Sequence, residues 1–368
     1  MARLLPWLTL LVLLLAGPAQ AKPPQAPSIG EVEEGDLLRL HLEGDPAAQG
    51  WLHRPKGTEA PSAENPVDLV VVLHGAGGTP KTLFFPEVMR RRRAWCLGVA
   101  GHEAVTHERG SGFMWDGSNV EYILALTQHV LAKHPIRKER VLVWGHSAGG
   151  TMTLETLAKA PTLFAGGLTT AAPRTPESRH QDQRVAVLMG TADPNWAGAP
   201  AIRSHLESLS KKKAKGACAF LAVEGLGHDV PDEAYLELGL DWVLAKGTRG
   251  GEARVPQRAV GREGPWRHIL LRPKGAPGAP EGAPSRKAAL ELLRKVKKDV
   301  EAGKAFFPLE AACHSMDAAS ASAGGGVEEA ALKAFVDPLP DVAPGALSEV
   351  LDLPGGVHLL ARTAREPT

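Results

Sequence analysis

The sequence predicts an α/β domain with a mostly parallel sheet, followed by a smaller α+β domain. Short apolar runs alternate with segments of helical spacing as far as about residue 246, which is typical of a parallel sheet covered on both faces. The pattern then changes, because one strand, one long amphipathic helix and two short strands follow residue 265. The length of 368 residues also favours two domains, since one core seldom serves so long a chain.

The first 21 residues have the pattern of an export signal. Arg3 supplies a positive charge, residues 4–15 form an apolar run, and Ala19-Gln20-Ala21 has the small-x-small form that a signal peptidase accepts. The run is short for a membrane span, so we expect a periplasmic or secreted protein with no stable span after cleavage. An uncleaved anchor is the weaker alternative. Residues 22–35 begin Pro-rich, and we expect an extended N-terminal linker there.

The first domain is expected over residues 36–247. Four apolar runs predict strands and four segments of helical spacing predict helices between or after them. The predicted strands are 68–73, 141–144, 185–189 and 218–223, and the predicted helices are 120–133, 151–160, 201–210 and 233–244.

Residues 248–264 are rich in Gly, Arg and Glu without sustained periodicity, which predicts a linker. The second domain is expected over residues 265–365. It begins with a strand at 267–272, a Gly/Pro/Ala loop at 273–284 and an amphipathic helix at 286–302. Two short strands, 348–351 and 357–363, are expected near its end.

The net charge bears on the class of binding partner, and the cysteine content bears on disulfide bonding. The formal net charge is +1, so we expect no nucleic-acid partner. Three cysteines are too few for a disulfide scaffold. Cys96 and Cys218 lie in apolar runs, where buried free thiols are expected, and Cys313 lies in a helical stretch. One disulfide is compatible with the sequence and none is required.

A serine stands between glycines where a predicted strand meets a predicted helix. Residues 145–149 read Gly-His-Ser-Ala-Gly and fit G-x-S-x-G. The glycines let strand and helix approach closely, so that Ser147 occupies a strained position with its Oγ exposed at the sheet edge. The sequence therefore predicts that Ser147 is a nucleophile.

A serine hydroxyl needs a base to take its proton, and the base needs an orienting acid. Asp193 and His228 each follow the end of a predicted strand, in the chain order Ser, Asp, His. We expect His228 to accept the proton and Asp193 to hold the imidazole. Asp182 is the rival acid, but it precedes its strand.

The tetrahedral intermediate needs donors for its oxyanion. A predicted strand ends in His-Gly-Ala-Gly-Gly at residues 74–78. The N–H of Ala148, after the nucleophile, and the N–H of Ala76 from this loop are the expected pair. Trp115 and Trp196 are expected near the cleft, either lining an acyl or aromatic pocket or packing in the core.

At these residues the chain resembles the α/β-hydrolases, in particular compact secreted esterases similar to polyhydroxybutyrate depolymerases and feruloyl esterases. The resemblance covers residues 36–246 and rests on HGAGG, GHSAGG, GTADP and GLGHDVP in this order. It implies a carboxylic ester substrate hydrolysed by a Ser-His-Asp triad, with no cofactor and no metal.

Histidines within two apolar strands mark the second domain. His268 lies in the first strand and His358 in the last, and the pattern of residues 288–326 lies between them. This arrangement is similar to the parvulins, the rotamase-type peptidyl-prolyl isomerases, over residues 265–365. The resemblance implies a four-stranded antiparallel sheet and an apolar pocket for a proline-containing polypeptide. It also implies paired histidines at 268 and 358, the pocket acid Asp317, and Phe335 against the proline ring.

Two segments depart from the parvulin pattern. Residues 325–328 read Gly-Gly-Val-Glu where the family continues Gly-Gly-Asp-Leu-Gly, and residues 353–355 lack the usual hydroxyl side chain. Three alternative functions are compatible with the sequence. Both domains are active, or only the esterase is active beside a peptide-binding domain, or the chain is a periplasmic folding factor with a decayed hydrolase.

Overall fold

The computed structural model describes most of the mature region predicted from the sequence. The described residues are 28–55, 61–107, 110–180, 182–211, 217–223, 225–245, 251–255, 266–302, 305, 307–317 and 325–362. The predicted export signal, residues 1–21, lies outside them.

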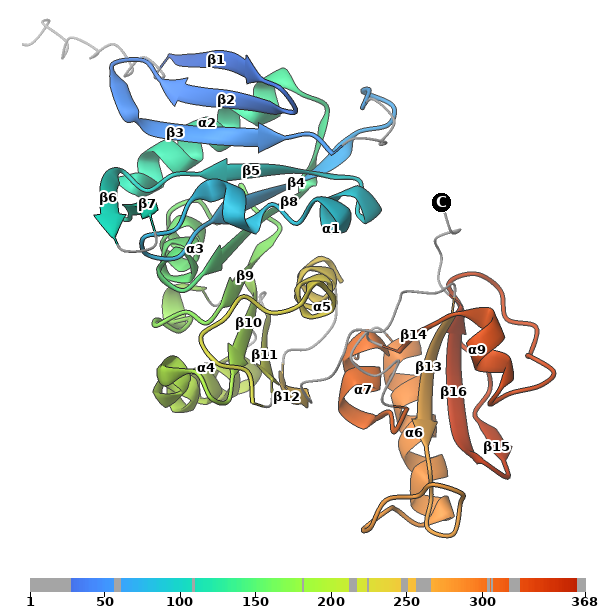
Figure 1. Cartoon of the computed structure of the whole chain (residues 1–368). Helices are drawn as coiled ribbons and strands as arrows, with labels where there is room; N and C mark the ends of the chain where they lie inside the picture. The colour runs from blue at the N-terminus through green and yellow to red at the C-terminus, as the bar shows by residue number, and fades with distance from the viewer. Residues whose placement is uncertain are drawn as a thin grey trace, which may run out of the picture.

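The N-terminal domain is built on a ten-stranded sheet with helices on both faces (Figure 1). All neighbours from β5 to β12 are parallel, whereas β1, β2 and β3 form an antiparallel meander that joins the sheet through an antiparallel β3–β5 pair. The predicted α/β class with a mostly parallel sheet is thus confirmed. In spatial order the strands are β1 (Ile29–Glu34), β2 (Leu37–Leu42), β3 (Asp45–His53), β5 (Ala94–Val99), β4 (Val67–Leu73), β8 (Ile136–His146), β9 (Gly166–Thr170), β10 (Arg184–Gly190), β11 (Ala217–Val223) and β12 (Gly251–Val255).

Two edge strands lie where the sequence predicted linkers. β1 falls within residues 22–35 and β12 within residues 248–264, and each pairs with one neighbouring strand. An edge strand has only one partner and tolerates charged residues, so its sequence lacks the apolar run that marks a central strand. Each of the two segments predicted as linkers therefore contains an edge strand of the sheet.

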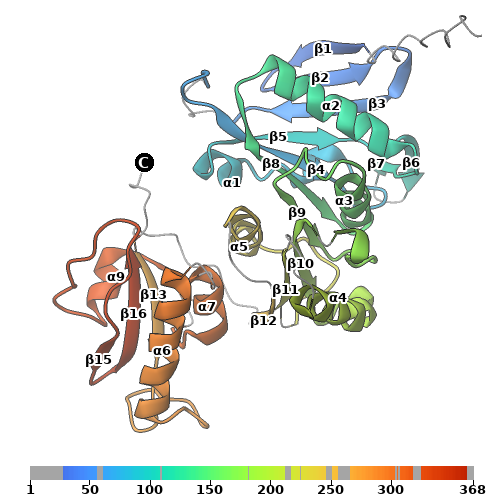
Figure 2. The same cartoon turned by 180° about the vertical axis from the view of Figure 1, so that it is seen from behind.

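Helices on the two faces bury two separate cores. α2 (Asn119–Lys133), α3 (Ala148–Lys159) and α4 (Ala199–Lys211) cover one face, and α1 (Pro86–Arg91) and α5 (Glu233–Leu244) cover the other (Figures 1 and 2). Buried Leu126 and Leu154 belong to the first core, and Trp144 and Trp242 to the second. Three 3-10 turns, η1 (Pro80–Leu83), η2 (Ser178–His180) and η3 (Pro194–Gly198), connect the elements, and β6 (Glu103–His107) pairs with β7 (Gly110–Met114) as a separate hairpin.

The C-terminal domain has the expected four-stranded antiparallel sheet. Its order is β14 (Gly326–Val327), β13 (Trp266–Leu271), β16 (Gly356–Arg362) and β15 (Leu351–Leu353), and every pair is antiparallel. α6 (Arg286–Glu301), α7 (Phe307–His314) and α9 (Glu329–Lys333) surround the sheet (Figure 1). The α+β class predicted for this domain is confirmed.

The sequence explains where α6 begins and which side it buries. The Ser285 side chain accepts a hydrogen bond from the Ala288 N–H at 3.2 Å, as a helix cap does. Ala289, Leu293 and Val296 repeat at helical spacing and are buried in the core of this domain. Burial of this stripe therefore fixes the rotation of the helix.

The predicted strand at 348–351 is displaced. The structure has β15 at Leu351–Leu353, while Leu347 forms only an isolated bridge with Ala361. Ser348 also pairs with Leu360 through its backbone and through its Oγ, which accepts the Leu360 N–H at 3.0 Å. The residues preceding β15 thus contact β16 without continuing the regular ladder.

In the described ranges, no helix has both the length and the apolar character needed to cross a lipid bilayer. Cys96 and Cys218 are free and buried, in agreement with the expectation for thiols in apolar strands. The Cys313 side chain lies outside what the structure describes.

Candidate active sites

Ser147 lies on a strained turn between β8 and α3. Its φ of 54° and ψ of −120° are rare for a residue with a side chain. A Cβ on Gly149 would stand 2.0 Å from the Leu73 carbonyl oxygen, and one on Gly145 would stand 2.0 Å from the Gly149 carbonyl oxygen. The two glycines therefore permit the contact between strand and helix that forces the turn.

Of the three residues expected to form a triad, His228 lies within hydrogen-bonding distance of both Ser147 and Asp193. His228 Nε2 lies 2.8 Å from Ser147 Oγ, and His228 Nδ1 lies 3.0 Å from Asp193 Oδ1. The Asp193 side chain is fully buried, whereas His228 is solvent-accessible. Asp182 lies just before β10, at the opposite end of this strand from Asp193. These contacts fit the expected roles of nucleophile, base and orienting acid, and the roles themselves stay a prediction.

Asn195 is a neighbour of the triad that the sequence analysis did not single out. Its backbone N–H donates to Asp193 Oδ1 at 2.7 Å, and its side-chain Nδ2 donates to the Ala171 carbonyl at 3.0 Å. Nδ2 also lies 3.5 Å from His228 Nδ1. The Asp-Pro-Asn turn was the available signal, because Asp often accepts the N–H two residues on. Asn195 thus helps to fix the orientation of the Asp193 carboxylate.

The loop after β4 lies beside Ser147. A Cβ on Gly75 would stand 3.4 Å from the Ser147 Cβ, and the Gly77 N–H donates to the Phe113 carbonyl at 2.9 Å. Ala76 is exposed in this loop. Ala148 is the first residue of α3, where a backbone N–H has no partner within the helix. The assignment of the Ala76 and Ala148 N–H groups as oxyanion donors stays a prediction.

His74 fixes this loop and is not exposed to substrate. Its Nε2 accepts the Gly101 N–H at 2.9 Å and its Nδ1 donates to the Gly75 carbonyl at 2.7 Å, so that both ring nitrogens are used. Burial lowers the pKa of His74 to about 4. The ring is therefore neutral, as these two bonds require.

His146 also lies beside the triad. Its ring centroid is 5.4 Å from that of His228, and its Nδ1 lies 3.2 Å from Thr170 Oγ1. Burial, with the nearby His228 as a smaller cause, lowers the pKa of His146 to about 4. A neutral imidazole at this position avoids charge repulsion when His228 becomes protonated.

The two tryptophans named from the sequence both make packing contacts. Trp115 donates its Nε1–H to the His74 carbonyl at 2.7 Å and stacks on the His74 ring at 4.6 Å. Trp196 packs near Phe220, with ring centroids 5.7 Å apart. Trp115 therefore holds the loop that follows β4, and a role of either residue in an acyl pocket stays a prediction.

A pair of buried histidines forms the centre of the second site. His268 on β13 and His358 on β16 are each at most 1% exposed, and the His268 Nε2 lies 2.9 Å from the His358 Nδ1. Burial is the main reason why their pKa values fall to about 3 and about 4, respectively. The Phe335 ring lies 5.4 Å from the His268 ring. The site is thus a neutral histidine pair beside an aromatic ring.

The turn that carries Asp317 is fastened to the strand of His268. Ser315 Oγ accepts the Leu270 N–H at 3.1 Å and the Asp317 N–H at 3.3 Å, and Met316 N donates to the Leu270 carbonyl. Asp317 is buried. Its role as pocket acid stays a prediction.

Arg272 was not named from the sequence, although it lies at the edge of this site. Its guanidinium donates to the Met316 carbonyl at 3.3 Å. Its positive charge contributes to the lowered pKa values of His268 and His358. Its position at the end of β13, four residues after His268, was the only signal in the sequence.

The altered glycine segment of this domain forms a strand. Gly325 has a φ of 86° and its carbonyl accepts the His268 N–H at 2.8 Å. β14 then pairs with Trp266 and Arg267. The departure from the parvulin pattern at residues 325–328 therefore leaves the sheet intact.

Within the parts of the chain that the structure describes, no group of three or more His, Cys, Asp or Glu side chains is placed to hold a metal ion.

Two family models match separate parts of the chain. The model of the prolyl oligopeptidase family matches residues 107–230, which include Ser147, Asp193 and His228. The model of the PPIC-type PPIase domain matches residues 268–364, which include His268, Asp317 and His358. Each match thus contains the polar residues of one site.

Curated and solved proteins are similar to the two domains. The peptidyl-prolyl cis-trans isomerase Pin1 of Arabidopsis thaliana is 32% identical over 110 residues, which are 26% of this chain and 92% of that protein. S-formylglutathione hydrolase of Staphylococcus aureus is 14% identical, with a TM-score of 0.41, over 59% of this chain and 99% of that chain. A carboxylesterase of Mesorhizobium loti is 18% identical, with a TM-score of 0.41, over 57% of this chain and 98% of that chain.

Proposed function

We propose that this chain, which belongs to the PPIC-type peptidyl-prolyl isomerase family through its C-terminal domain, is a bifunctional enzyme that also hydrolyses carboxylic esters. The hydrolytic activity is assigned to the N-terminal α/β-hydrolase domain. The observation that carries it is the hydrogen-bonded series from Asp193 through His228 to Ser147, which follow the carboxyl ends of β10, β11 and β8 in the same sheet.

The geometry supports an acyl-enzyme mechanism. Ser147 Oγ forms a bond to the ester carbonyl carbon while His228 Nε2 takes the hydroxyl proton. When the C–O bond to the alcohol breaks, His228 returns the proton to the departing oxygen. Water then attacks the acyl-enzyme with His228 again as base, which releases the acid and restores Ser147. Asp193 stabilises the imidazolium at each step.

The second activity needs no bond to break. Rotation about an X–Pro amide has a barrier of about 18–20 kcal/mol, and an enzyme lowers it by binding the twisted amide better than either planar isomer. Phe335 supplies an apolar ring beside the polar ring atoms of the neutral pair of His268 and His358. We assign proline binding to Phe335 and tuning of the hydrogen bonds around the amide to the histidines and Asp317.

Peptide hydrolysis is a second candidate for the N-terminal site. The match to the prolyl oligopeptidase family favours it, because the matched residues contain the whole triad. A peptide substrate passes through the same tetrahedral intermediate, so the triad alone does not separate the two reactions. A short chromogenic ester and a chromogenic proline-containing peptide, assayed in parallel, decide between them.

The decisive experiment separates the two sites by mutation. Ser147→Ala should abolish ester hydrolysis and leave prolyl isomerisation unchanged, while His268→Ala should do the reverse. Ser178→Ala, at an exposed serine of η2, is the matched control for the first variant and should keep both activities. Loss of both activities in Ser147→Ala, or of neither, would contradict two independent sites.

Export is the remaining part of the proposal, and it rests on residues 1–21. The mature protein should begin at Lys22 and be found in the periplasm or the medium. N-terminal sequencing of the protein from fractionated cells tests this. A start at Met1 in the cytoplasmic fraction would remove this part of the proposal and leave the two activities untouched.

A further inference from the structure

We propose that His102, held between the carboxylates of Asp45 and Asp116, positions the loop that supplies the oxyanion donor to Ser147. This inference rests on the proposed esterase function. His102 contacts no member of the triad in the structure, so it is a positioning residue and not a catalytic one.

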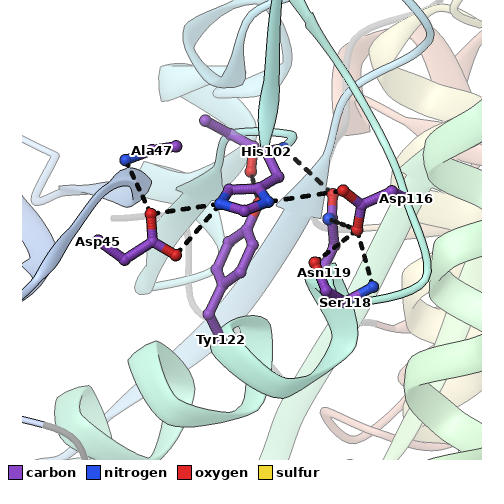
Figure 3. Close-up of polar contacts among 8 residues, drawn as sticks. Asp45, Ala47, His102, Asp116, Ser118, Asn119 and Tyr122 are labelled. Carbon is purple, nitrogen blue, oxygen red and sulfur yellow. Dashed lines mark hydrogen bonds and ion pairs between the residues drawn. The ribbon is translucent and has the colours of Figure 1, made fainter.

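His102 bridges two carboxylates from opposite sides of its ring (Figure 3). Its Nε2 lies 3.1 Å from Asp45 Oδ2, and its Nδ1 lies 3.5 Å from Asp116 Oδ2. Asp45 begins β3, His102 lies between β5 and β6, and Asp116 lies between β7 and α2. The imidazole therefore ties together three segments that are distant in sequence.

Both carboxylates are held in place by neighbouring groups, as Figure 3 shows. The Ala47 N–H donates to Asp45 Oδ1 at 3.2 Å, and the Ser118 N–H donates to Asp116 Oδ1 at 2.7 Å. Asn119 donates its Nδ2 to the same Asp116 oxygen at 2.6 Å, and its Oδ1 accepts the backbone N–H of His102 at 3.2 Å. The cluster is therefore organised around the ring before any substrate binds.

The residues that precede His102 and Asp116 in the chain contact His74 in the loop after β4, which supplies the proposed oxyanion donor. Gly101, next to His102, donates its N–H to the His74 ring, and Trp115, next to Asp116, donates its indole N–H to the His74 carbonyl. A Cβ on Gly101 would stand 2.2 Å from the Met114 carbonyl, so these two segments are in direct contact. A shift at the bridge would thus move both anchors of His74.

His74 transmits this constraint to the nucleophile. It is followed by Gly75, whose added Cβ would lie 3.4 Å from Ser147 Cβ. Oxyanion donors act only when they stand about 2.7–3.1 Å from the developing charge. Small displacements of this loop should therefore lower the rate of the chemical step more than the binding of substrate.

The bridge needs a protonated ring. A neutral imidazole has one N–H, so one of its nitrogens would then turn a lone pair toward a carboxylate. The hydrogen bond with Asp45, and to a lesser degree the charge of Asp116, raises the pKa of His102 above its usual 6.5. The bridge is complete below this raised pKa and is lost as the pH rises through it.

Two other titratable groups lie near the bridge. Tyr122 on α2 faces the His102 ring, and burial raises the pKa of its phenol, which donates to the Ala100 carbonyl. His74 stacks on Trp115, but its pKa is lowered to about 4. Both groups therefore titrate well away from the range in which His102 changes charge.

The test compares His102→Gln with His129→Gln in the full chain. His129 on α2 is also paired with a carboxylate, at 2.6 Å from Glu31, but lies apart from the loop after β4. His102→Gln should lower kcat on a short-chain ester about two- to fivefold, in line with the loss of a partly exposed ion pair, with KM little changed. The wild-type kcat should decline as the pH rises through the pKa of His102, and His102→Gln should not show this decline. His129→Gln should behave as wild type.

A second measurement does not depend on turnover. The indole N–H resonance of Trp115, assigned with Trp115→Phe, should titrate in the wild type and in His129→Gln with a midpoint above 6.5, and should be constant over that range in His102→Gln. A Trp115 resonance unaffected by His102, or equal kcat losses in both variants, would overturn the inference. A protein that hydrolyses no ester but shows the coupled Trp115 titration would refute the proposed function and support the bridge.

Discussion

His268 and His358 lie with their rings 8° from parallel and their facing nitrogens 2.9 Å apart, on adjacent antiparallel strands. The register pairs Leu270 with His358 and His268 with Leu360, so the two histidines are diagonal neighbours on one side of the pair. Two buried imidazoles this close remain neutral, because a second positive charge would be neither solvated nor balanced.

This pair should make the C-terminal domain sensitive to acid. The folded pKa values of about 3 and about 4 lie below the usual 6.5, so the unfolded chain binds more protons as the pH falls. The contribution of the neutral histidine pair to the stability of the domain is complete above about pH 6.5 and is lost progressively toward pH 4. Between pH 7 and pH 5 we expect the free energy of unfolding to fall by about 2 kcal/mol per histidine.

Hydrogen exchange of peptides from β13 and β16 measures this loss within the full chain. The double variant His268→Gln/His358→Gln should show a smaller pH dependence of protection. His314→Gln, at the partly exposed histidine of α7, is the control and should retain it. Equal pH dependence in the wild type and the double variant would rule out this origin.

Asp193→Asn should lower kcat for ester hydrolysis by about 10³–10⁴ with little effect on KM. An amide at this position favours the wrong tautomer of His228 while keeping the shape of the buried site. Asp182→Asn is the matched control, since Asp182 lies at the far end of β10, and it should retain the wild-type rate. The reverse ranking of the two variants would reassign the acid of the triad.

Gly149→Ala should destabilise the N-terminal domain. The added methyl group would stand 2.0 Å from the Leu73 carbonyl oxygen, which the sheet holds in place. Overpacking of this kind costs about 1–3 kcal/mol or more, and we expect the upper end of that range because the clash is with backbone. Gly117→Ala, where no atom lies within 4 Å, should leave the midpoint of thermal unfolding within about 2 °C.

The buried Arg92 side chain should make the stability of this domain depend on Asp241. Arg92 Nη1 lies 2.6 Å from Asp241 Oδ1, and the arginine side chain is 2% exposed. Asp241→Asn leaves a buried positive charge with less compensation, and we expect a loss of about 3 kcal/mol. The double variant Arg92→Met/Asp241→Leu should lose less, as urea unfolding would show. A double variant less stable than Asp241→Asn alone would contradict this account.

Central elements of both domains could be predicted from sequence alone. Apolar runs located β4, β8, β10 and β11, and helical spacing located α2 and α6, because these elements are buried on defined faces. The edge strands β1 and β12 were missed, since an edge strand carries few of the apolar residues that mark a strand. β2, β3, β5 and β9, which lie inside the sheet, were also not among the predicted strands. α3 begins at Ala148 and not at 151, because glycine spacing hides the first turn of a helix.

By itself the sequence determined the order of strand, turn and helix around Ser147, and the chain order of Asp193 and His228 behind it. Those are local properties, since each residue follows the end of its own strand. Only the tertiary structure decided that Asn195 reaches the Ala171 carbonyl and His228, that Arg272 lies near His358, and that His102 bridges Asp45 and Asp116. These relations join segments far apart in the chain, and no periodicity or motif records which loops the folded sheet brings together.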